Sequence, residues 1–420
     1  MIMQDNEKKP ALRFKGFTDP WEQRKLAELT KTITTGKSVN SDEGEVSDGD
    51  IGVLKTSCVS YDRFNPSESK PVVKSEQQLV KCAVEKDSVI VSRMNTPERV
   101  GACGYVSTDF PNLFLPDRLW KLKFQDTVDT YFVYMMLVSS AYKEKITSMA
   151  SGTSGSMYNI PKETFLNLQL VIPAKIDEQK QLGRILKKID SLITLHQRKY
   201  EKLVNIKKSM LDKMFPKNGA SVPEIRFKGF TDPWEQRKLG EIAKEVVRND
   251  PASDAPIMMI TAGNGFIEQS DRYAFNNAGE SLKKYILLER GELAYNHGAS
   301  KLRPYGSCFA LTTVEKARIP FVYHCFSVEK SNPEFLSIEL NGANVENQLR
   351  KIVSSGARMD GLLNIAYSEY TEVTVQLPKK EEQDWIAKFF KHLDTLITLH
   401  QRKLEKLQNI KKSCLEKMFV

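Results

Sequence analysis

Two loops of similar composition follow strand-like runs in the two halves of the chain. The first reads Ser-Arg-Met-Asn-Thr-Pro-Glu-Arg at 92–99, and the second reads Asn-His-Gly-Ala-Ser-Lys-Leu-Arg at 296–303. A further pair of loops, rich in Ser and Gly, occupies 151–159 and 354–360. Arg, Asn, Lys and Ser side chains supply the hydrogen-bonding groups that base edges and phosphates require. The loops are therefore candidate DNA contacts, although the same residue types also fill ordinary surface loops.

The candidate contact residues lie on these loops and on neighbouring polar stretches. In the first half of the chain they are Lys37, Lys55, Arg93, Asn95, Thr96, Arg99, Thr153, Ser154 and Tyr158. In the second half they are Asn264, Asn296, His297, Lys301, Arg303, Tyr305 and Arg358.

Motifs for catalysis are missing from the sequence. The nearest match to the NPPY motif of an adenine methyltransferase is Asn332-Pro333-Glu334-Phe335, which has Glu at the second proline and reads better as a helix cap. There is no P-loop, no HExxH and no nuclease D/E-x-K in the right context. The chain is therefore predicted to bind and not to catalyse.

The six cysteines are far apart and form no CxxC pair. This spacing predicts free thiols in a reducing cytoplasm and neither a disulfide framework nor a zinc site. The first residues are polar, and no run of about 18 apolar residues occurs, so we expect neither a signal peptide nor a membrane span.

Length and charge set the class of protein. A chain of 420 residues is too long for one ordinary core and indicates two or more domains. The formal net charge is +9, which favours a polyanionic partner without proving one.

The elements that must position the loops are arranged as an internal repeat. Residues 12–26 read LRFKGFTDPWEQRKL, and residues 225–239 differ from them at one position. A second repeated block, LITLHQRK, occupies 192–199 and 396–403. Between these constant blocks lie two dissimilar inserts. We therefore divide the chain into constant segments at 1–26 and 218–239, globular inserts at 27–173 and 240–377, and helical segments at 174–217 and 378–420.

The two helical segments carry apolar residues at spacings of three and four, the pattern of one helix face. The stripe comprises Leu182, Ile185, Ile189, Leu192, Leu203, Ile206, Met210 and Met214, and the second copy follows it position by position. A lone helix of this length needs a partner, so the two copies are predicted to form an antiparallel coiled coil. His196 and His400 lie on or beside the stripe. They are interpreted as polar positions that fix register, in preference to a metal or pH site.

The charge of the chain is concentrated in the same segments. Lys and Arg outnumber Asp and Glu by 12 to 5 in 175–217 and by 10 to 6 in 379–419. The excess is +11, which leaves about −2 elsewhere. This is either a solvated basic face or a surface near DNA or acidic partners.

The constant block and the inserts give a mixed pattern. Thr-Asp-Pro-Trp-Glu resembles a helix start, with Asp19 and Asp232 as caps. The inserts contain strand-like runs at 88–91, 168–172, 292–295 and 373–377, and a helix-like run at 131–146. The fold class is therefore predicted to be α+β, with two mixed globular domains joined by two long helices in a pseudo-two-fold repeat.

This plan resembles the specificity subunit of Type I restriction-modification systems, over nearly the whole chain. RFKGFTDPWEQRKL looks like the constant segment of the family in low-GC Gram-positive bacteria, and LVIPAKIDEQKQLGRILKKIDSLI looks like its join between recognition domain and spacer helix. VQLPKKEEQDWIAKFFKHLDTLI is the second copy of that join. The resemblance implies that each insert is a target recognition domain that reads one half of a bipartite site in double-stranded DNA.

The resemblance also implies partners and places the cofactors on them. The paired helices would hold the readers apart and dock two methyltransferase subunits, and two motor-nuclease subunits would join for cleavage. S-adenosylmethionine, ATP and magnesium would bind those partners, with no cofactor in this chain. Two other hypotheses stay open: a recognition chain that also cuts or methylates, and a coiled-coil scaffold that binds only protein.

Overall fold

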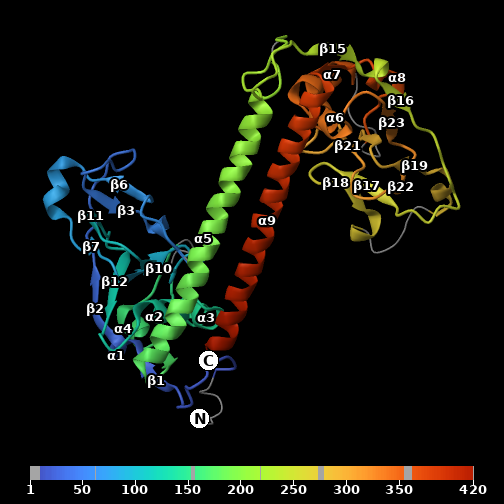
Figure 1. Ribbon diagram of the computed structural model, residues 1–420. Helices are drawn as coiled ribbons and strands as arrows, with labels where there is room; N and C mark the ends of the chain where they lie inside the picture. The colour runs from blue at the N-terminus through green and yellow to red at the C-terminus, as the bar shows by residue number, and fades with distance from the viewer. Residues whose placement is uncertain are drawn as a thin grey trace. The chain divides into compact units, whose positions relative to one another are not determined.

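The computed structural model describes residues 10–61, 63–152, 157–217, 219–272, 279–353 and 362–419. The chain forms two compact units. The first consists of residues 1–198 with 401–420, and the second of residues 199–400. Each unit therefore combines one globular insert with part of each long helix (Figure 1).

The first unit is a mixed α and β domain. Its strands are β1 (Glu22–Lys25), β2 (Thr30–Thr35), β3 (Gly52–Leu54), β4 (Val59–Ser60), β5 (Arg63–Phe64), β6 (Ser69–Pro71), β7 (Ala83–Val84), β8 (Ser88–Ser92), β9 (Met94–Asn95), β10 (Cys103–Val106), β11 (Phe110–Phe114), β12 (Leu119–Phe124), β13 (Tyr158–Asn159) and β14 (Gln169–Ile172). Its helices are α1 (Leu26–Leu29), α2 (Thr130–Leu137), α3 (Ser140–Ser148), α4 (Lys162–Leu166) and the first part of α5 (Ile176–Lys213).

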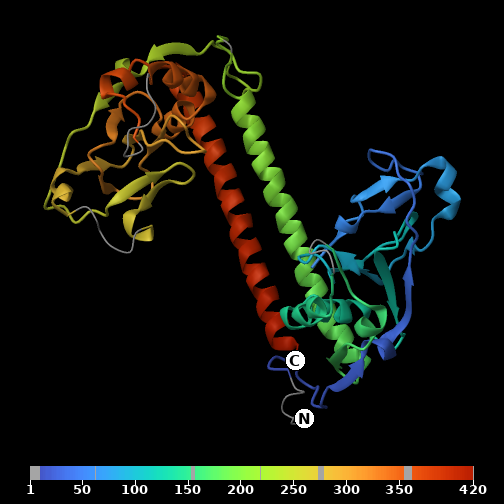
Figure 2. The ribbon, with the colours of Figure 1, turned by 180° about the vertical axis from the view of Figure 1, so that it is seen from behind.

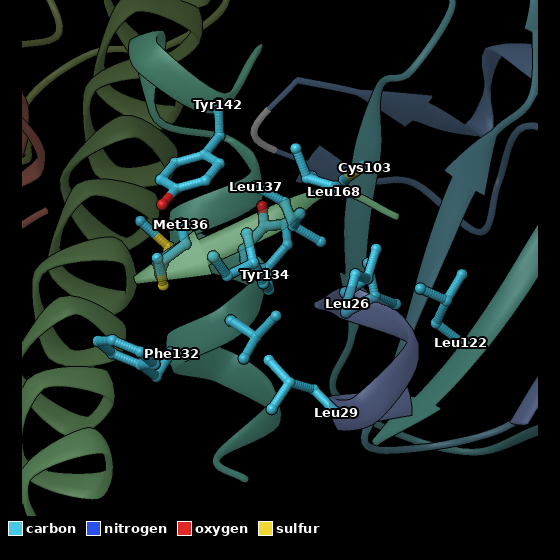
Figure 3. Close-up of a cluster of buried hydrophobic side chains, with 14 of the residues drawn as sticks. Leu26, Leu29, Cys103, Leu122, Phe132, Tyr134, Met136, Leu137, Tyr142 and Leu168 are labelled. Carbon is cyan, nitrogen blue, oxygen red and sulfur yellow. The ribbon is translucent and has the colours of Figure 1, made fainter. Parts of the chain in front are cut away.

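Two four-stranded sheets organise this unit. One is antiparallel with the order β10-β8-β12-β2, and the other has the order β6-β3-β11-β7 with β3 and β11 parallel. All five residues of β8 are buried, as expected of a central strand. Helix α2 is buried along its whole length, and Figure 3 shows Phe132, Tyr134 and Met136 from this helix in the core.

The second unit repeats this class with smaller sheets. Its strands are β15 (Glu235–Lys238), β16 (Ala243–Glu245), β17 (Met258–Thr261), β18 (Gly265–Glu268), β19 (Ile286–Glu289), β20 (Leu293–Asn296), β21 (Ser307–Ala310), β22 (Lys316–Ile319), β23 (His324–Val328) and β24 (Thr374–Leu377). Its helices are α6 (Pro333–Leu340), α7 (Ala343–Ile352), α8 (Tyr367–Tyr370) and the first part of α9 (Lys380–Met418). The main sheet has the order β16-β23-β20-β21.

The long helices α5 and α9 run side by side in both views (Figures 1 and 2). In the first unit, Cys414, Leu415 and Met418 at the end of α9 join the core that holds Leu182 and Leu186 of α5. In the second unit, the roles are exchanged, because Leu203, Ile206 and Met210 of α5 join the core that holds Phe390 and Leu393 of α9. The predicted fold class, with an antiparallel helix pair, is confirmed.

The first turn of each long helix carries a Glu–Gln pair that hydrogen-bonds to the constant block and to the insert of its unit. In the first unit, the guanidinium of Arg13 donates two hydrogen bonds to Glu178, at 2.6 and 2.7 Å. The neighbouring Gln179 accepts from the backbone N–H of Asp129 at 3.1 Å and donates to the carbonyl of Pro173 at 2.9 Å. Asp129 caps α2 by accepting from the N–H of Phe132. The constant block and the insert are thus tied to the same turn of α5.

The second unit has the same fastening. Arg226 donates to Glu382 at 2.7 Å through both nitrogens, and Gln383 bridges Asn332 and the carbonyl of Pro378. Asn332 caps α6, with Pro333 in the first turn, which confirms its interpretation as a helix cap. Strand β15 pairs antiparallel with β24 as β1 pairs with β14. The sequence repeat is therefore also a structural repeat.

The predicted helix start in the constant block is wrong. Asp19 does not cap a helix, since Lys175 forms an ion pair with its carboxylate at 2.7 Å and residues 22–25 form strand β1. Trp21 is buried, with its indole N–H 3.4 Å from Glu178. Pairing with β14 satisfies the backbone of this segment, so tertiary pairing overrides the local capping pattern.

The predicted helix at 131–146 is also interrupted. It is two helices, α2 and α3, that meet at Ser139, whose hydroxyl donates to the carbonyl of Met136. A serine that bonds back to the preceding turn competes with helix continuation, which explains the break.

Candidate nucleic-acid interface

Three loops of the first unit converge around Asp117, at one end of the β10-β8-β12-β2 sheet. The guanidinium Nε of Arg93 donates to the carbonyl of Asp117 at 2.7 Å, and its Nη1 lies 3.4 Å from Asn159 Oδ1. The hydroxyl of Ser38 donates to the Asp117 carboxylate. Lys37, next to Ser38, is exposed. The structure therefore brings the predicted residues Lys37 and Arg93 to one edge of the unit. Some of the hydrogen-bonding groups of Arg93 are already used within the unit, by Asp117 and Asn159.

Asn95 shapes this loop from inside. It is buried in β9, opposite Tyr158 of β13. Its amide donates to Ser92 Oγ at 3.0 Å, and its Oδ1 accepts from the N–H of Thr96. Beyond it, residues 96–99 are exposed. Thr96 and Arg99 are thus free to contact a ligand, whereas the buried amide of Asn95 is occupied.

Lys55 and Tyr158 are half-buried beside the same loop. The amide of Asn95 lies 3.5 Å from the carbonyl of Thr56, which places the residue after Lys55 next to β9. Tyr158 is in β13, which pairs with β9.

The corresponding loop of the second unit starts at the end of β20. The amide of Asn296 donates to the carbonyl of Ile260 at 3.0 Å, and its Oδ1 accepts from the N–H of Gly298 at 2.9 Å. His297 is buried, with its two ring nitrogens each 2.8 Å from a carbonyl, of Leu363 and of Val322. Both side chains hold the loop to neighbouring segments.

The tip of this loop is a tight turn from Ser300 to Arg303. The N–H of Ser300 donates to the carbonyl of Arg303, and the N–H of Arg303 donates to the hydroxyl of Ser300, both at 3.0 Å. Arg303 also donates through Nη1 to the carbonyl of Asn341 at 2.6 Å, and burial lowers its pKa. Lys301 and Leu302 are left exposed at the tip.

Two further predicted residues of this unit lie close to the tip. Asn264 is exposed in the turn between β17 and β18, and a Cβ at the adjacent Gly263 would be 3.7 Å from Leu302. Tyr305 is half-buried, and its carbonyl accepts from the hydroxyl of Tyr295 at 2.7 Å. The turn that carries Asn264 therefore lies next to the turn that carries Lys301.

In the first unit, one exposed cation beside Arg93 was missed by the sequence analysis. Arg118 is exposed, and its carbonyl accepts from the N–H of Arg93, but no local sequence signal distinguishes it. The predicted residues Thr153, Ser154 and Arg358 lie outside the described residues.

Among the described residues, no three His, Cys, Asp or Glu side chains gather as a metal site would require. In the same part of the chain, no helix has the length and apolar character to cross a bilayer.

Comparison with known proteins places this architecture. Residues 18–205 match the family model of the Type I restriction modification DNA specificity domain. The type I restriction enzyme MjaVIII specificity subunit of Methanocaldococcus jannaschii is 25% identical over 316 residues, covering 68% of each chain. A second protein of that organism, assigned as the MjaX specificity subunit, is 21% identical over 416 residues, covering 94% of this chain and 91% of the relative. The chain is therefore similar to type I specificity subunits over most of its length.

The fold of the chain agrees with that of a solved structure. The crystal structure of the S subunit of a type I restriction-modification system from M. genitalium matches with a TM-score of 0.62 and 16% identity. The match covers 98% of this chain and 99% of that one, so the likeness in fold extends over both inserts and both helices.

Proposed function

We propose that this chain is a type I specificity subunit that reads a bipartite site in double-stranded DNA, with one half-site for each unit. The observation that carries the proposal is the repeated frame. The Arg–Glu pair, the Gln bridge and the β1–β14 pairing recur in the second unit, around an insert with a different sequence and smaller sheets. A constant frame with divergent inserts suits a protein that presents two different readers in equivalent positions.

The helix pair α5 and α9 is proposed to set the distance between the half-sites. Two readers related by a pseudo-two-fold axis meet one face of the duplex when their half-sites are about one helical turn, roughly 34 Å, apart. The excess positive charge of the helical segments supports a position near DNA or acidic partner surfaces.

The chemistry is proposed to reside in partners. Two methyltransferase subunits would supply adenine methylation with S-adenosylmethionine, and two restriction subunits would supply ATP- and magnesium-dependent cleavage in the cytoplasm. This chain would be non-catalytic, which is supported by the lack of methyltransferase and nuclease motifs in its sequence.

Methylome sequencing of DNA treated with the reconstituted methyltransferase complex tests the proposal. Arg99→Ala should relax reading of one half-site only, and Lys301→Ala should relax the other, because the two exposed side chains belong to different units. A lost base contact costs about 1–3 kcal/mol. A base contact shows as relaxed sequence preference, whereas a phosphate contact would weaken methylation of all sites equally.

Two controls complete this test. The chain incubated with S-adenosylmethionine and DNA without partners should methylate nothing, and methylation in that sample would make it an enzyme. Loss at both half-sites from either single variant would contradict the assignment of one half-site to each unit.

A further inference from the structure

An exposed aromatic cluster lies at the beginning of α9 in the second unit. Trp385 is 59% exposed, and its ring packs edge-on against Phe227 at 5.6 Å and near Phe230 at 6.5 Å between centroids. Phe227 also contacts Phe389 at 5.9 Å. We call Phe227, Phe230, Trp385 and Phe389 the aromatic patch. A contiguous apolar surface of this kind marks an interaction site more often than scattered apolar residues do.

The patch is built by a rigid turn. The chain Phe227-Lys228-Gly229-Phe230 folds back so that the N–H of Phe230 donates to the carbonyl of Phe227 at 3.4 Å, with Gly229 at a φ of +102°. The left-handed conformation of Gly229 is what allows the turn. The preceding residue, Arg226, is clamped to Glu382 on α9. The aromatic side chains are therefore held on the helix before any partner arrives.

The first unit has the same turn, but the residues of the long helix beside it are different. The turn is Phe14-Lys15-Gly16-Phe17, Gly16 has a φ of +101°, and Arg13 is clamped to Glu178. The positions that Trp385 and Phe389 occupy on α9 correspond, at the offset of 204, to Gln181 and Ile185 on α5. The two units thus share the turn and differ in the helix residues beside it.

The sequence identity between the two constant blocks extends to exposed side chains that the fold does not require. Burial fixes Trp21 and Leu26, but Lys15, Gln23 and Lys25 are exposed and still have identical counterparts at 228, 236 and 238. The helix residues beside the turn differ between the units, whereas LITLHQRK farther along both helices is identical. An identical exposed surface in two units suits one kind of partner that binds the chain twice.

We infer that this surface docks one methyltransferase subunit on each unit, and that the two docking sites are unequal because only the second has the Trp385 anchor. The inference rests on the proposed function, which supplies a partner present in two copies. The partner surface is an apolar pocket that accepts an indole ring, with acidic groups facing the exposed Lys228 and Lys388. The first unit offers the equivalent cations Lys15 and Arg184 without the ring.

Titration calorimetry and native mass spectrometry of the full chain with its methyltransferase subunit test this inference. The wild-type chain should bind two subunits in a tight step and a weaker step. Trp385→Gln, which installs the residue of the first unit, should weaken the tight step roughly thirtyfold, the loss typical of removing a tryptophan anchor. Gln181→Trp should strengthen the weaker step and bring the two steps together.

The control is Val247→Gln, which removes an apolar side chain that is 74% exposed in the same unit and lies outside the patch. It should leave both steps unchanged. Two equal steps in the wild-type chain that Trp385→Gln does not alter would overturn the inference and leave the proposed function intact. A failure of the wild-type chain to bind any methyltransferase subunit would overturn both.

Discussion

At the scale of single residues, Glu339 is a carboxyl group whose pKa is clearly raised by burial. It lies on α6, it is almost fully buried, and its Oε1 accepts from the N–H of Gln376 at 3.0 Å. Burial raises the pKa of this carboxyl from about 4.5 to about 7, against the opposing effect of the hydrogen bonds. The folded state therefore favours the protonated form.

The sign of the resulting pH dependence follows from this shift. The contribution of Glu339 to stability is fully present below pH 4.5 and is lost as the pH rises through 7, because the unfolded chain then gains more from ionisation. Over a shift of this size the loss is roughly 3 kcal/mol.

Glu339→Gln should remove this penalty. A glutamine keeps an acceptor for the N–H of Gln376 and carries no charge, so the variant should be more stable than the wild type above pH 7 and should gain little at pH 5. Urea unfolding of the full chain between pH 5 and 8.5 measures the difference. The exposed Glu329→Gln serves as a control. A gain that does not depend on pH would show that ionisation of Glu339 is not its cause.

The sequence could predict which loops carry DNA-contacting residue types. It could not predict which residues of those loops are exposed and which are buried. Asn95 and His297 have the side chains of DNA-contacting residues, yet both are buried and bonded within their own units. The partners of His297 come from Val322 and Leu363, far away in the chain. Burial of this kind depends on how strands and loops assemble, so a local composition pattern identifies the loop and not its exposed members.

At the scale of elements, the first turn of each long helix is held by a buried ion pair. Arg226 and Glu382 are 12% and 1% exposed, so the pair has little access to water. Removing one partner from a buried pair leaves an uncompensated charge and costs about 3–5 kcal/mol, whereas replacing both with apolar residues costs far less.

Arg226→Met should therefore destabilise the second unit by about 3–5 kcal/mol, and the double variant Arg226→Met, Glu382→Met should recover most of the loss. Denaturant unfolding followed by circular dichroism gives both values, and a double-mutant cycle gives the coupling between them. The equivalent pair, Arg13 and Glu178, provides a second cycle in the first unit. Equal losses in the single and double variants would mean that the pair is not coupled.

The long helices could be predicted because their signal is local and repeats over ten turns. Stripe residues such as Leu182, Met210 and Met214 lie in the cores as the spacing indicates. The helix start predicted in the constant block was wrong for the opposite reason. Its Thr-Asp-Pro-Trp pattern is a weak local preference, and the pairing of β1 with β14, about 150 residues later, decides the conformation.

At the scale of the whole molecule, the ion pairs between α5 and α9 follow the repeat. Lys411 pairs with Asp190 in the first unit, and Lys207 pairs with Asp394 in the second. Subtracting the offset of 204 converts Lys411 into Lys207 and Asp394 into Asp190. Each pair is therefore the counterpart of the other. Two copies of α5 arranged in the same way would place Asp190 of one opposite Lys207 of the other, twice.

The hydrophobic contacts at the helix ends also have counterparts at the offset of 204. Met418 and Phe419 from the end of α9 pack in the core of the first unit, and the N–H of Leu12 donates to the carbonyl of Lys417. The counterparts of these residues are Lys213, the last residue of α5, and Met214 and Phe215 just beyond it, with the same side chains. A second copy of α5 can thus supply what α9 supplies in the full chain.

A fragment of residues 1–216 should therefore form a homodimer through its helices, whereas a fragment that ends at 198 should not, because it lacks Lys207, Met214 and Phe215. With methyltransferase subunits, the dimer should methylate the first half-site twice, as an inverted repeat with a spacer like that of the full chain. Substitutions such as Met210 in place of Cys414 alter the packing but keep the stripe apolar. Light scattering gives the mass and methylome sequencing gives the site. A monomeric 1–216 fragment, or methylation of an asymmetric site, would show that the two helices are not interchangeable.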